Sequence, residues 1–140
     1  MLGESSPKIN MVSKRFPKSE RLCSKNAIDQ LFAQGKNLRK GHLLLKYLLL
    51  EEALHEQRIG VLIAVPKSRL KKAVARNTIK RRLRELYRHY RHTLGLEAIP
   101  ANKTLIIAVI YSANEPRSYR EMEPDFQWLC QKLAAKLSGN

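Results

Sequence analysis

The stretch RIGVLIAVPKSRLKKAVARNTIKRRLRELYRHYR, residues 58–91, joins an apolar run to a strongly basic segment. Its first part, RIGVLIAV at 58–65, is a compact apolar run typical of a buried strand. Pro66 ends that run because proline has no amide hydrogen to donate to a sheet. From Lys71 to Arg91, nine of twenty-one positions are lysine or arginine, and the apolar residues between them follow a helical spacing. The stretch therefore predicts a strand followed by a basic helix.

The predicted helix has two different faces, because each residue turns it by about 100°. The apolar arc, with Tyr87 at its edge, contains Ala75, Ile79, Leu83, Leu86 and Tyr90. The outward arc contains Asn77, Lys80, Arg81, Arg84, Arg88 and Arg91. Like charges three or four residues apart repel one another, so a polyanion is the natural partner of this arc. Arginine dominates it, and a guanidinium can bind a phosphate with two parallel donors. Asn77 has a second interpretation, as a residue that caps the start of the helix.

The rest of the chain supplies further strands and helices around this unit. Compact apolar runs predict strands at 42–50 and 104–111. A short amphipathic helix is expected between Ser24 and Gly35, and a second from Met122 to Leu137 with an apolar stripe typical of a core. Interleaved helices and strands indicate the α+β or α/β class, one sheet covered by helices. We expect a single domain over residues 19–140, preceded by a flexible basic arm over residues 1–18.

Charge is the strongest compositional signal. The chain has 140 residues and a formal net charge of +15, with a pI near 10.2, which favours an anionic partner. Cys23 and Cys130 have no CxxC or Cys/His companions, so neither a zinc site nor a disulfide framework is predicted. No segment has the length and apolarity of a signal core or a membrane span. We expect a soluble cytoplasmic protein without a membrane partner.

RNA is favoured over DNA as the anionic partner. A helix-turn-helix reader of DNA needs a companion helix before its recognition helix, and here a strand and the basic loop PKSRLKK precede it. A folded RNA is recognised largely by shape and phosphate placement, which suits a rigid cationic helix. The four histidines, His42, His55, His89 and His92, show no metal-ligand or acid–base spacing, so no catalytic residue and no metal site are predicted in the protein.

Several segments of the sequence resemble the bacterial ribonuclease P proteins. They are FPKSERL at 16–22, LFAQGK at 31–36, RIGVLIAVPK at 58–67, ARNTIKRRLRE at 75–85 and TLIIAVIY at 104–111. The resemblance implies a small α/β sandwich with a mostly antiparallel sheet, of the ribosomal protein S5 domain 2-like type. It also implies a left-handed β-α-β crossover, against the usual right-handed rule. Nothing in the periodicity of the sequence indicates that handedness.

The resemblance also implies a function and a set of sites. The protein would be the accessory subunit of an endoribonuclease in which a catalytic RNA, with Mg²⁺ held mainly by that RNA, removes the 5′ leader of precursor tRNA. The residues expected to bind the catalytic RNA are Lys71, Lys72, Arg76, Asn77, Lys80, Arg81, Arg84 and Arg88. Those expected to line a cleft for the leader are Ile28, Phe32, Lys46, Tyr47, Lys67 and Ser68. Phe32 could equally belong to the core, and the sheet face of Tyr47 depends on a register that the sequence leaves open.

Three positions depart from the family pattern. Thr78 replaces an arginine of the signature, Ile28 stands where phenylalanine is frequent, and Ser68 replaces the second of two lysines. Two other functions remain open at this level: a basic structural module such as a ribosomal protein, and a nuclease that needs no RNA subunit. The first would prefer ribosomal RNA, and the second would require a carboxylate or histidine cluster for a metal.

Overall fold

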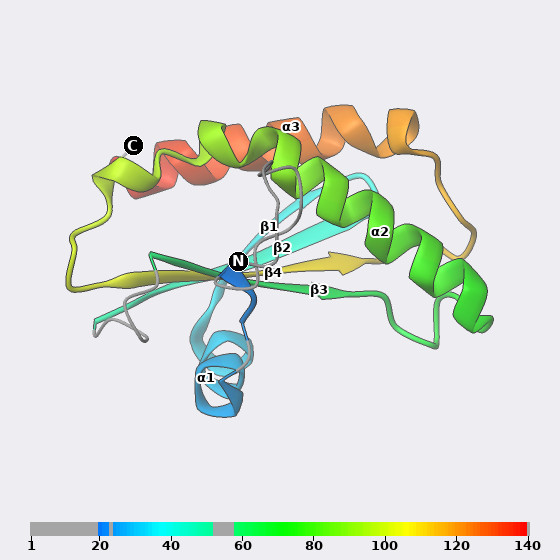
Figure 1. Cartoon of the computed structure of the whole chain (residues 1–140), viewed down its shortest axis with the longest axis horizontal. Helices are drawn as coiled ribbons and strands as arrows, with labels where there is room; N and C mark the ends of the chain where they lie inside the picture. The colour runs from blue at the N-terminus through cyan, green and yellow to red at the C-terminus, as the bar shows by residue number, and fades with distance from the viewer. Residues whose placement is uncertain (1–19, 23, 52–57, 140) are drawn as a thin grey trace, which may run out of the picture.

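The computed structural model describes residues 20–22, 24–51 and 58–139, so the arm predicted over residues 1–18 lies outside it. The elements are α1 (Lys25–Gln34), β1 (Lys36–Lys40), β2 (Leu43–Leu50), β3 (Ile59–Ala64), α2 (Ala73–Tyr90), β4 (Thr104–Tyr111) and α3 (Tyr119–Leu137), with two short 3₁₀ turns at Arg91–Leu94 and Leu96–Ala98. The four strands form one sheet, with helices α2 and α3 on one face and helix α1 on the other (Figure 1). None of the helices in the described ranges has the length and apolarity needed to cross a membrane.

The sheet has the order β1-β2-β4-β3. Antiparallel pairs join β1 to β2 and β2 to β4, while β3 and β4 run parallel. Helix α2 connects the two parallel strands across one face of the sheet. Viewed from the α2 side with both strands pointing upward, β4 lies to the left of β3, so this crossover is left-handed (Figure 1). The α+β class and the crossover implied by the resemblance are confirmed.

Local sequence explains where the helices begin. The Ser24 hydroxyl accepts a hydrogen bond from the Ala27 amide at 3.2 Å, and α1 ends before Gly35 as predicted. Helix α3 begins at Tyr119, three residues earlier than the apolar stripe indicated. Ser118 and Glu121 form a capping box there, in which each side chain binds the other residue's backbone amide. Strand β1 was missed because its sequence, KNLRK, has only one apolar residue.

The two faces of the sheet carry two separate apolar clusters. The larger lies beneath α2 and α3 and includes Leu45, Leu83, Tyr87, Phe126 and Leu129, all with at most 1% of their surface exposed. The smaller lies beneath α1 (Figure 1) and is built from Leu22, Ala27, Leu31, Ile106 and Ala108. Alternation along each strand sends successive side chains to opposite clusters. Within the described ranges, α1 is the helix that packs on the second face.

The segment before α1 is attached to the edge of the sheet. The Leu22 amide donates to the Val61 carbonyl at 2.9 Å, and Arg21 forms an isolated parallel bridge with the same residue of β3. This edge of β3 is open to such pairing because β4 pairs with the other edge of the strand. The direction in which α1 leaves the sheet is therefore set by β3.

Candidate RNA-binding surfaces

Helix α2 buries one face and exposes the other, as its periodicity predicts. Ile79, Leu83, Leu86 and Tyr87 are fully buried beneath it. Tyr87, expected at the edge of the apolar arc, is fully buried. Tyr90, expected inside the arc, is half-buried, and its hydroxyl donates to Glu123 of α3 at 2.6 Å. That bond raises the pKa of Tyr90 to about 12. The buried face is thus rotated slightly from the predicted one.

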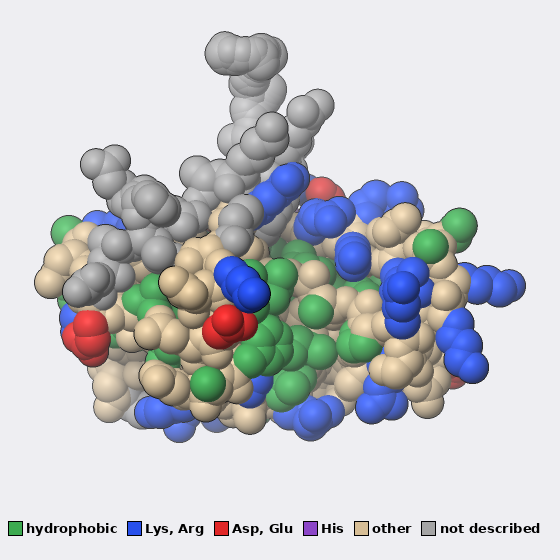
Figure 2. Space-filling model, turned by 90° about the horizontal axis from the view of Figure 1, so that it is seen from below, with side chains coloured by type: hydrophobic (Ala, Val, Ile, Leu, Met, Phe, Trp, Pro, Cys, Tyr) green, Lys and Arg blue, Asp and Glu red, His purple; other side chains and the backbone are tan. Residues whose placement is uncertain are grey.

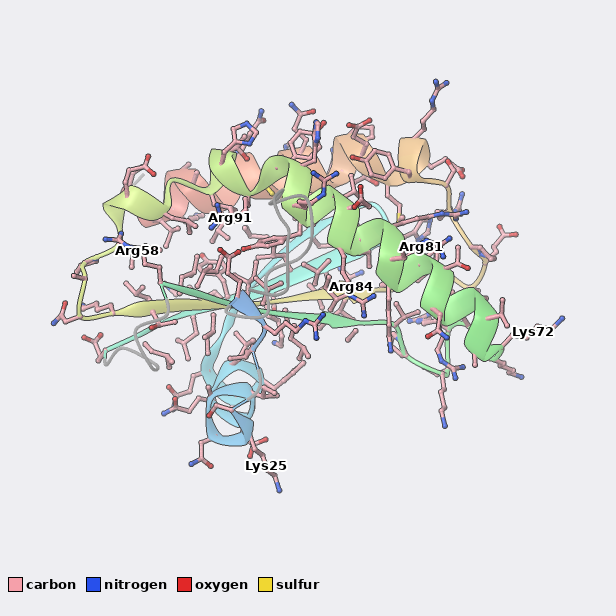
Figure 3. All side chains as sticks on the ribbon, in the orientation of Figure 1. Lys25, Arg58, Lys72, Arg81, Arg84 and Arg91 are labelled. Carbon is pink, nitrogen blue, oxygen red and sulfur yellow. The ribbon has the colours of Figure 1, made fainter. Side chains whose placement is uncertain are left out.

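The opposite side of α2 carries cationic side chains that point to solvent (Figure 3). We call this the α2 cationic surface, and define it by Lys71, Lys72, Asn77, Lys80, Arg81 and Arg84. All are exposed except Lys80, which is partly buried. The residue that caps the helix is Lys72, so the interpretation of Asn77 as a capping residue is wrong. Asn77 instead adds an uncharged donor and acceptor to a surface of five cations.

Arg76 has a structural contact of its own. Its Nη1 donates to the carbonyl oxygens of Leu70 and Lys71, both at 2.8 Å, and so fastens the turn between β3 and α2. Thr78, which replaces a signature arginine, donates its hydroxyl to the Val74 carbonyl at 3.0 Å within the same helix. RNA binding by Arg76 stays a prediction, but its removal would also disturb the turn that presents Lys71 and Lys72.

The last two cations of the predicted outward arc are held by carboxylates. Arg88 forms a two-pronged pair with Glu85, with its Nη2 at 2.8 Å from Oε2 and its Nε at 3.2 Å from Oε1. This hydrogen bonding raises the pKa of the Arg88 guanidinium. Arg91 pairs with Glu20, which also accepts the Tyr87 hydroxyl. The positive field of α2 is therefore strongest toward its N-terminal end.

Glu20 connects the segment before α1 to the C-terminal end of α2. Arg91 lies between that helix end and the sheet (Figure 3), and its Nε donates to Glu20 Oε1 at 3.1 Å. Burial is the main cause that raises the pKa of Tyr87, and the bond to Glu20 adds to it, so this phenol stays protonated. The pairs of Arg88 and Arg91 were missed from sequence. Glu85 could have been found from its i, i+3 spacing to Arg88, whereas Glu20 and Arg91 are 71 residues apart.

On the other face of the sheet, an exposed aromatic ring and a lysine lie together. Phe32 of α1 is 44% exposed, so it does not belong to the core. The Lys46 ammonium of β2 lies 5.9 Å from the centre of the Phe32 ring, within the range of a cation–π contact. Asn37 of β1 accepts a hydrogen bond from Lys46 Nζ at 2.9 Å and fixes its direction. Ile28, also predicted in the cleft, is partly buried against the smaller cluster.

The assignment of Tyr47 to the cleft was wrong. Residues 43–50 of β2 pair in register with β4, so Lys46 lies on the α1 face and its neighbour Tyr47 lies on the opposite one. There Tyr47 packs against the large cluster under α2 and α3. Lys67 and Ser68 are exposed in the turn after β3, near the start of α2. Their part in the cleft stays a prediction.

Beside α1 the sheet leaves apolar side chains partly exposed. Leu48, Leu50, Leu62 and Ile110 border the small cluster and are only partly buried. Figure 2 looks onto this side and shows hydrophobic side chains gathered at its centre, with lysines and arginines to the right and along the lower rim. An apolar surface framed by cations can accept bases by stacking and the backbone by charge, without reading a particular sequence.

Comparison with known proteins shows the family of this chain. The family model for ribonuclease P matches residues 16–134. The chain belongs to the ribonuclease P protein family. The ribonuclease P protein component of Chlorobaculum tepidum is 35% identical over 104 residues, which cover 70% of this chain and 68% of that protein. The component of Porphyromonas gingivalis is 32% identical over 124 residues, covering 88% and 86% of the two chains.

Solved structures of the ribonuclease P family share the fold. The protein from Thermotoga maritima superposes with a TM-score of 0.62 at 21% identity, covering 81% of this chain and 96% of that one. The protein from Staphylococcus aureus gives 0.60 at 15% identity, covering 87% and 97%. At these identities the agreement concerns the arrangement of helices and strands.

The described part of this ribonuclease P family member offers no cluster of metal ligands. Among residues 20–22, 24–51 and 58–139, no group of three His, Cys, Asp or Glu side chains is placed to hold an ion. Several described carboxylates serve other contacts, as Glu85 does for Arg88 and Glu121 for the start of α3. Backbone and side-chain hydrogen bonds from Ser118 lower the pKa of Glu121, which keeps that carboxylate ionised. The donor set of the described residues therefore does not fit a resident magnesium site.

Proposed function

We propose that this chain is the protein subunit of a cytoplasmic ribonuclease P. In this role it binds the catalytic RNA through the α2 cationic surface and the 5′ leader of precursor tRNA on the α1 side of the sheet. The RNA performs the endonucleolytic cleavage that gives the mature tRNA its 5′ end. The observation that carries the proposal is the α2 cationic surface on a chain of this family.

The charge distribution along α2 supports binding of a folded RNA. Lys80, Arg81 and Arg84 project from a helix that is rigidly seated by Ile79, Leu83 and Leu86. Rigid seating means that little conformational freedom is lost when the arginines bind phosphates. Because several phosphates are neutralised together, affinity should fall steeply as salt concentration rises.

The pair of Phe32 and Lys46 supports a leader site on the other face. A partly exposed ring can stack on any base, and an ammonium 5.9 Å from its centre can bind the adjoining phosphate. Neither contact distinguishes one base from another. A surface of this kind suits an enzyme whose precursor substrates have different leader sequences.

Magnesium ions enter this proposal through the RNA. When bound there, Mg²⁺ supplies the activated water and the charge stabilisation for phosphodiester hydrolysis. The protein contributes positive charge that reduces repulsion between the phosphates of the catalytic RNA and those of its substrate. It should therefore lower the magnesium concentration needed for cleavage.

The first experiment is cleavage of a precursor tRNA at low magnesium by bacterial ribonuclease P RNA, with and without this protein, together with the protein alone. We expect cleavage only when protein and RNA are combined. Loss of the effect in a Lys80→Gln/Arg81→Gln/Arg84→Gln variant would tie it to α2. A Lys25→Gln/Lys103→Gln/Arg120→Gln variant, with three neutralised cations outside α2, serves as the matched control and should retain the effect.

Each of the other outcomes would indicate a different function for this protein. Cleavage by the protein alone would make it a nuclease in its own right. No stimulation of the catalytic RNA, together with preferential binding of ribosomal RNA, would indicate a structural RNA-binding module. Either result would overturn the proposed subunit function.

A further inference from the structure

A second group of lysines lies on the side of α3 that faces away from α2. Two ammonium groups converge on one indole there. Lys40 Nζ of β1 is 5.2 Å from the centre of the Trp128 ring, and Lys132 Nζ of α3 is 5.4 Å from it. We define the β1–α3 surface by Lys36, Lys40, Trp128, Lys132 and Lys136.

The geometry of both elements places further lysines beside this pair. On β1, Lys36 and Lys40 share a face with Leu38, which packs on the α3 side of the sheet. On α3, Trp128, Lys132 and Lys136 are spaced by four residues and so follow one stripe of the helix. Lys36, Lys40, Lys132 and Lys136 are all exposed. Asp125 is the nearby acid, since its Oδ2 lies against the space that a side chain at Gly41 would fill.

This surface is separate from the α2 cationic surface. Helix α3 turns a different side to α2, where Glu123 accepts the Tyr90 hydroxyl. In the sheet order β1-β2-β4-β3, α3 covers β1 and β2, and α2 contacts β3 at the other edge (Figure 1). A polyanion that spans both surfaces would have to extend across α3.

A simpler explanation for lysines on β1 is that they keep an edge strand from pairing with another chain. That role does not require a lysine from α3 to converge on the same ring. Two ammonium groups near one indole repel each other, and phosphates bound by the two lysines would reduce this repulsion. Because the ring already orients both ammonium groups, little side-chain freedom is lost when an anion binds.

We infer that the β1–α3 surface is a second RNA-binding site, in which Lys40 and Lys132 bind the phosphate backbone of a structured RNA. This inference rests on the proposed function for the identity of the RNA, which is either the catalytic RNA or the body of the precursor tRNA. Both sources present the same phosphate chemistry. Binding of each RNA to a variant without the two lysine charges shows which of the two RNAs occupies the site.

The test compares the full-length Lys40→Gln/Lys132→Gln variant with a Lys25→Gln/Lys103→Gln control that loses the same charge elsewhere. Dissociation constants are measured over a range of salt concentrations in two arms: catalytic RNA with the protein, and precursor tRNA with the assembled enzyme. We expect the first variant to bind about tenfold more weakly near 0.15 M salt. Its slope of log affinity against log salt should decrease by about 1 to 2, while the control stays within about twofold of the original chain.

Trp128 provides a local readout because it is the only tryptophan in the chain. Bound RNA should shield its fluorescence from acrylamide, and this protection should be lost in Lys40→Gln/Lys132→Gln. An unchanged salt slope in both arms, with equal acrylamide quenching in free and bound protein, overturns the second site. If Arg81→Gln/Arg84→Gln still weakens binding in that case, the proposed function stands. If it does not, the proposed function fails as well.

Discussion

The two faces of the sheet differ in coverage far more than in composition. Leu45 and Leu48 belong to the same strand, yet Leu45 is fully buried beneath α2 and α3, and Leu48 is only partly buried beside α1. Two long helices of 18 and 19 residues close the first face, whereas one helix of 10 residues covers part of the second. The first face is a core, and the second leaves apolar side chains partly exposed.

The charges follow the same division. On the closed face the cations are carried on the outer side of α2, away from the sheet, where they can reach a large folded partner. On the open face Lys46 lies among apolar side chains of the sheet itself, beside Phe32. A closed layer thus presents charge alone, and an open layer presents charge and aromatic surface together. That difference fits a folded RNA on one side and an unpaired strand on the other.

Truncation of matched leucines on β2 is expected to give the largest difference between the faces. Leu45→Ala should lower the free energy of unfolding by about 3 kcal/mol, because it leaves a cavity in a closed core. Leu48→Ala should cost about 1 kcal/mol, because part of its side chain already contacts solvent. Urea denaturation followed by Trp128 fluorescence measures both values. Equal losses would mean that the α1 side is as tightly packed in solution as the other.

Neutralisation along α2 separates free cations from paired ones. Lys80→Gln/Arg81→Gln/Arg84→Gln should weaken binding of the catalytic RNA by about 30-fold or more, because charge-assisted contacts to phosphate are lost. Arg88→Gln should weaken it by no more than about threefold, because Glu85 already neutralises that guanidinium. The companion variant Glu85→Gln should tighten binding slightly. An Arg88→Gln effect as large as that of the triple variant would show that Arg88 exchanges Glu85 for phosphate in the complex.

Removal of the exposed ring tests the open face directly. Phe32→Ala should raise KM about fivefold for precursors with long leaders, because stacking on the leader is lost. Precursors almost without a leader should be unaffected, and the free energy of unfolding should change by less than about 1 kcal/mol for a side chain that is 44% exposed. Lys46→Gln should reproduce the leader dependence more weakly. Equal KM changes for both substrates would remove Phe32 from the leader site.

The smallest expected effect is a pH dependence from the closed face. Burial raises the pKa of the Cys130 thiol to about 12, from an ordinary value of 9.0. A raised pKa means that the unfolded chain loses this proton first, so the stabilisation is complete below pH 9 and declines toward pH 12. Near pH 9.5 the loss should be under about 1 kcal/mol. Urea denaturation of Cys130→Ala between pH 8 and 10 should show a shallower decline than the original chain, and identical slopes would contradict the shift.

Much of the candidate site could be predicted because its signals are local. The outward side of α2 followed from a 100° rotation applied to neighbouring residues, and Asn77, Arg81 and Arg84 are exposed as that rotation requires. Tyr47 was placed wrongly because a choice between two sheet faces depends on the pairing of β2 with β4, more than fifty residues away. The residue that caps α2 was also missed, since Lys72 makes no side-chain capping bond by which it could be recognised.

The sequence by itself determined β2, β3, β4, the amphipathic helices and the sign of the charge on α2, because periodicity and composition act between residues near one another in the chain. Only the tertiary structure decided which cations remain free. Glu20 reaches Arg91 and Lys40 reaches Trp128 across 71 and 88 positions, through the attachment of the N-terminal segment to β3 and the packing of α3 on β1. Contacts of that span depend on strand order and register, which no local pattern specifies.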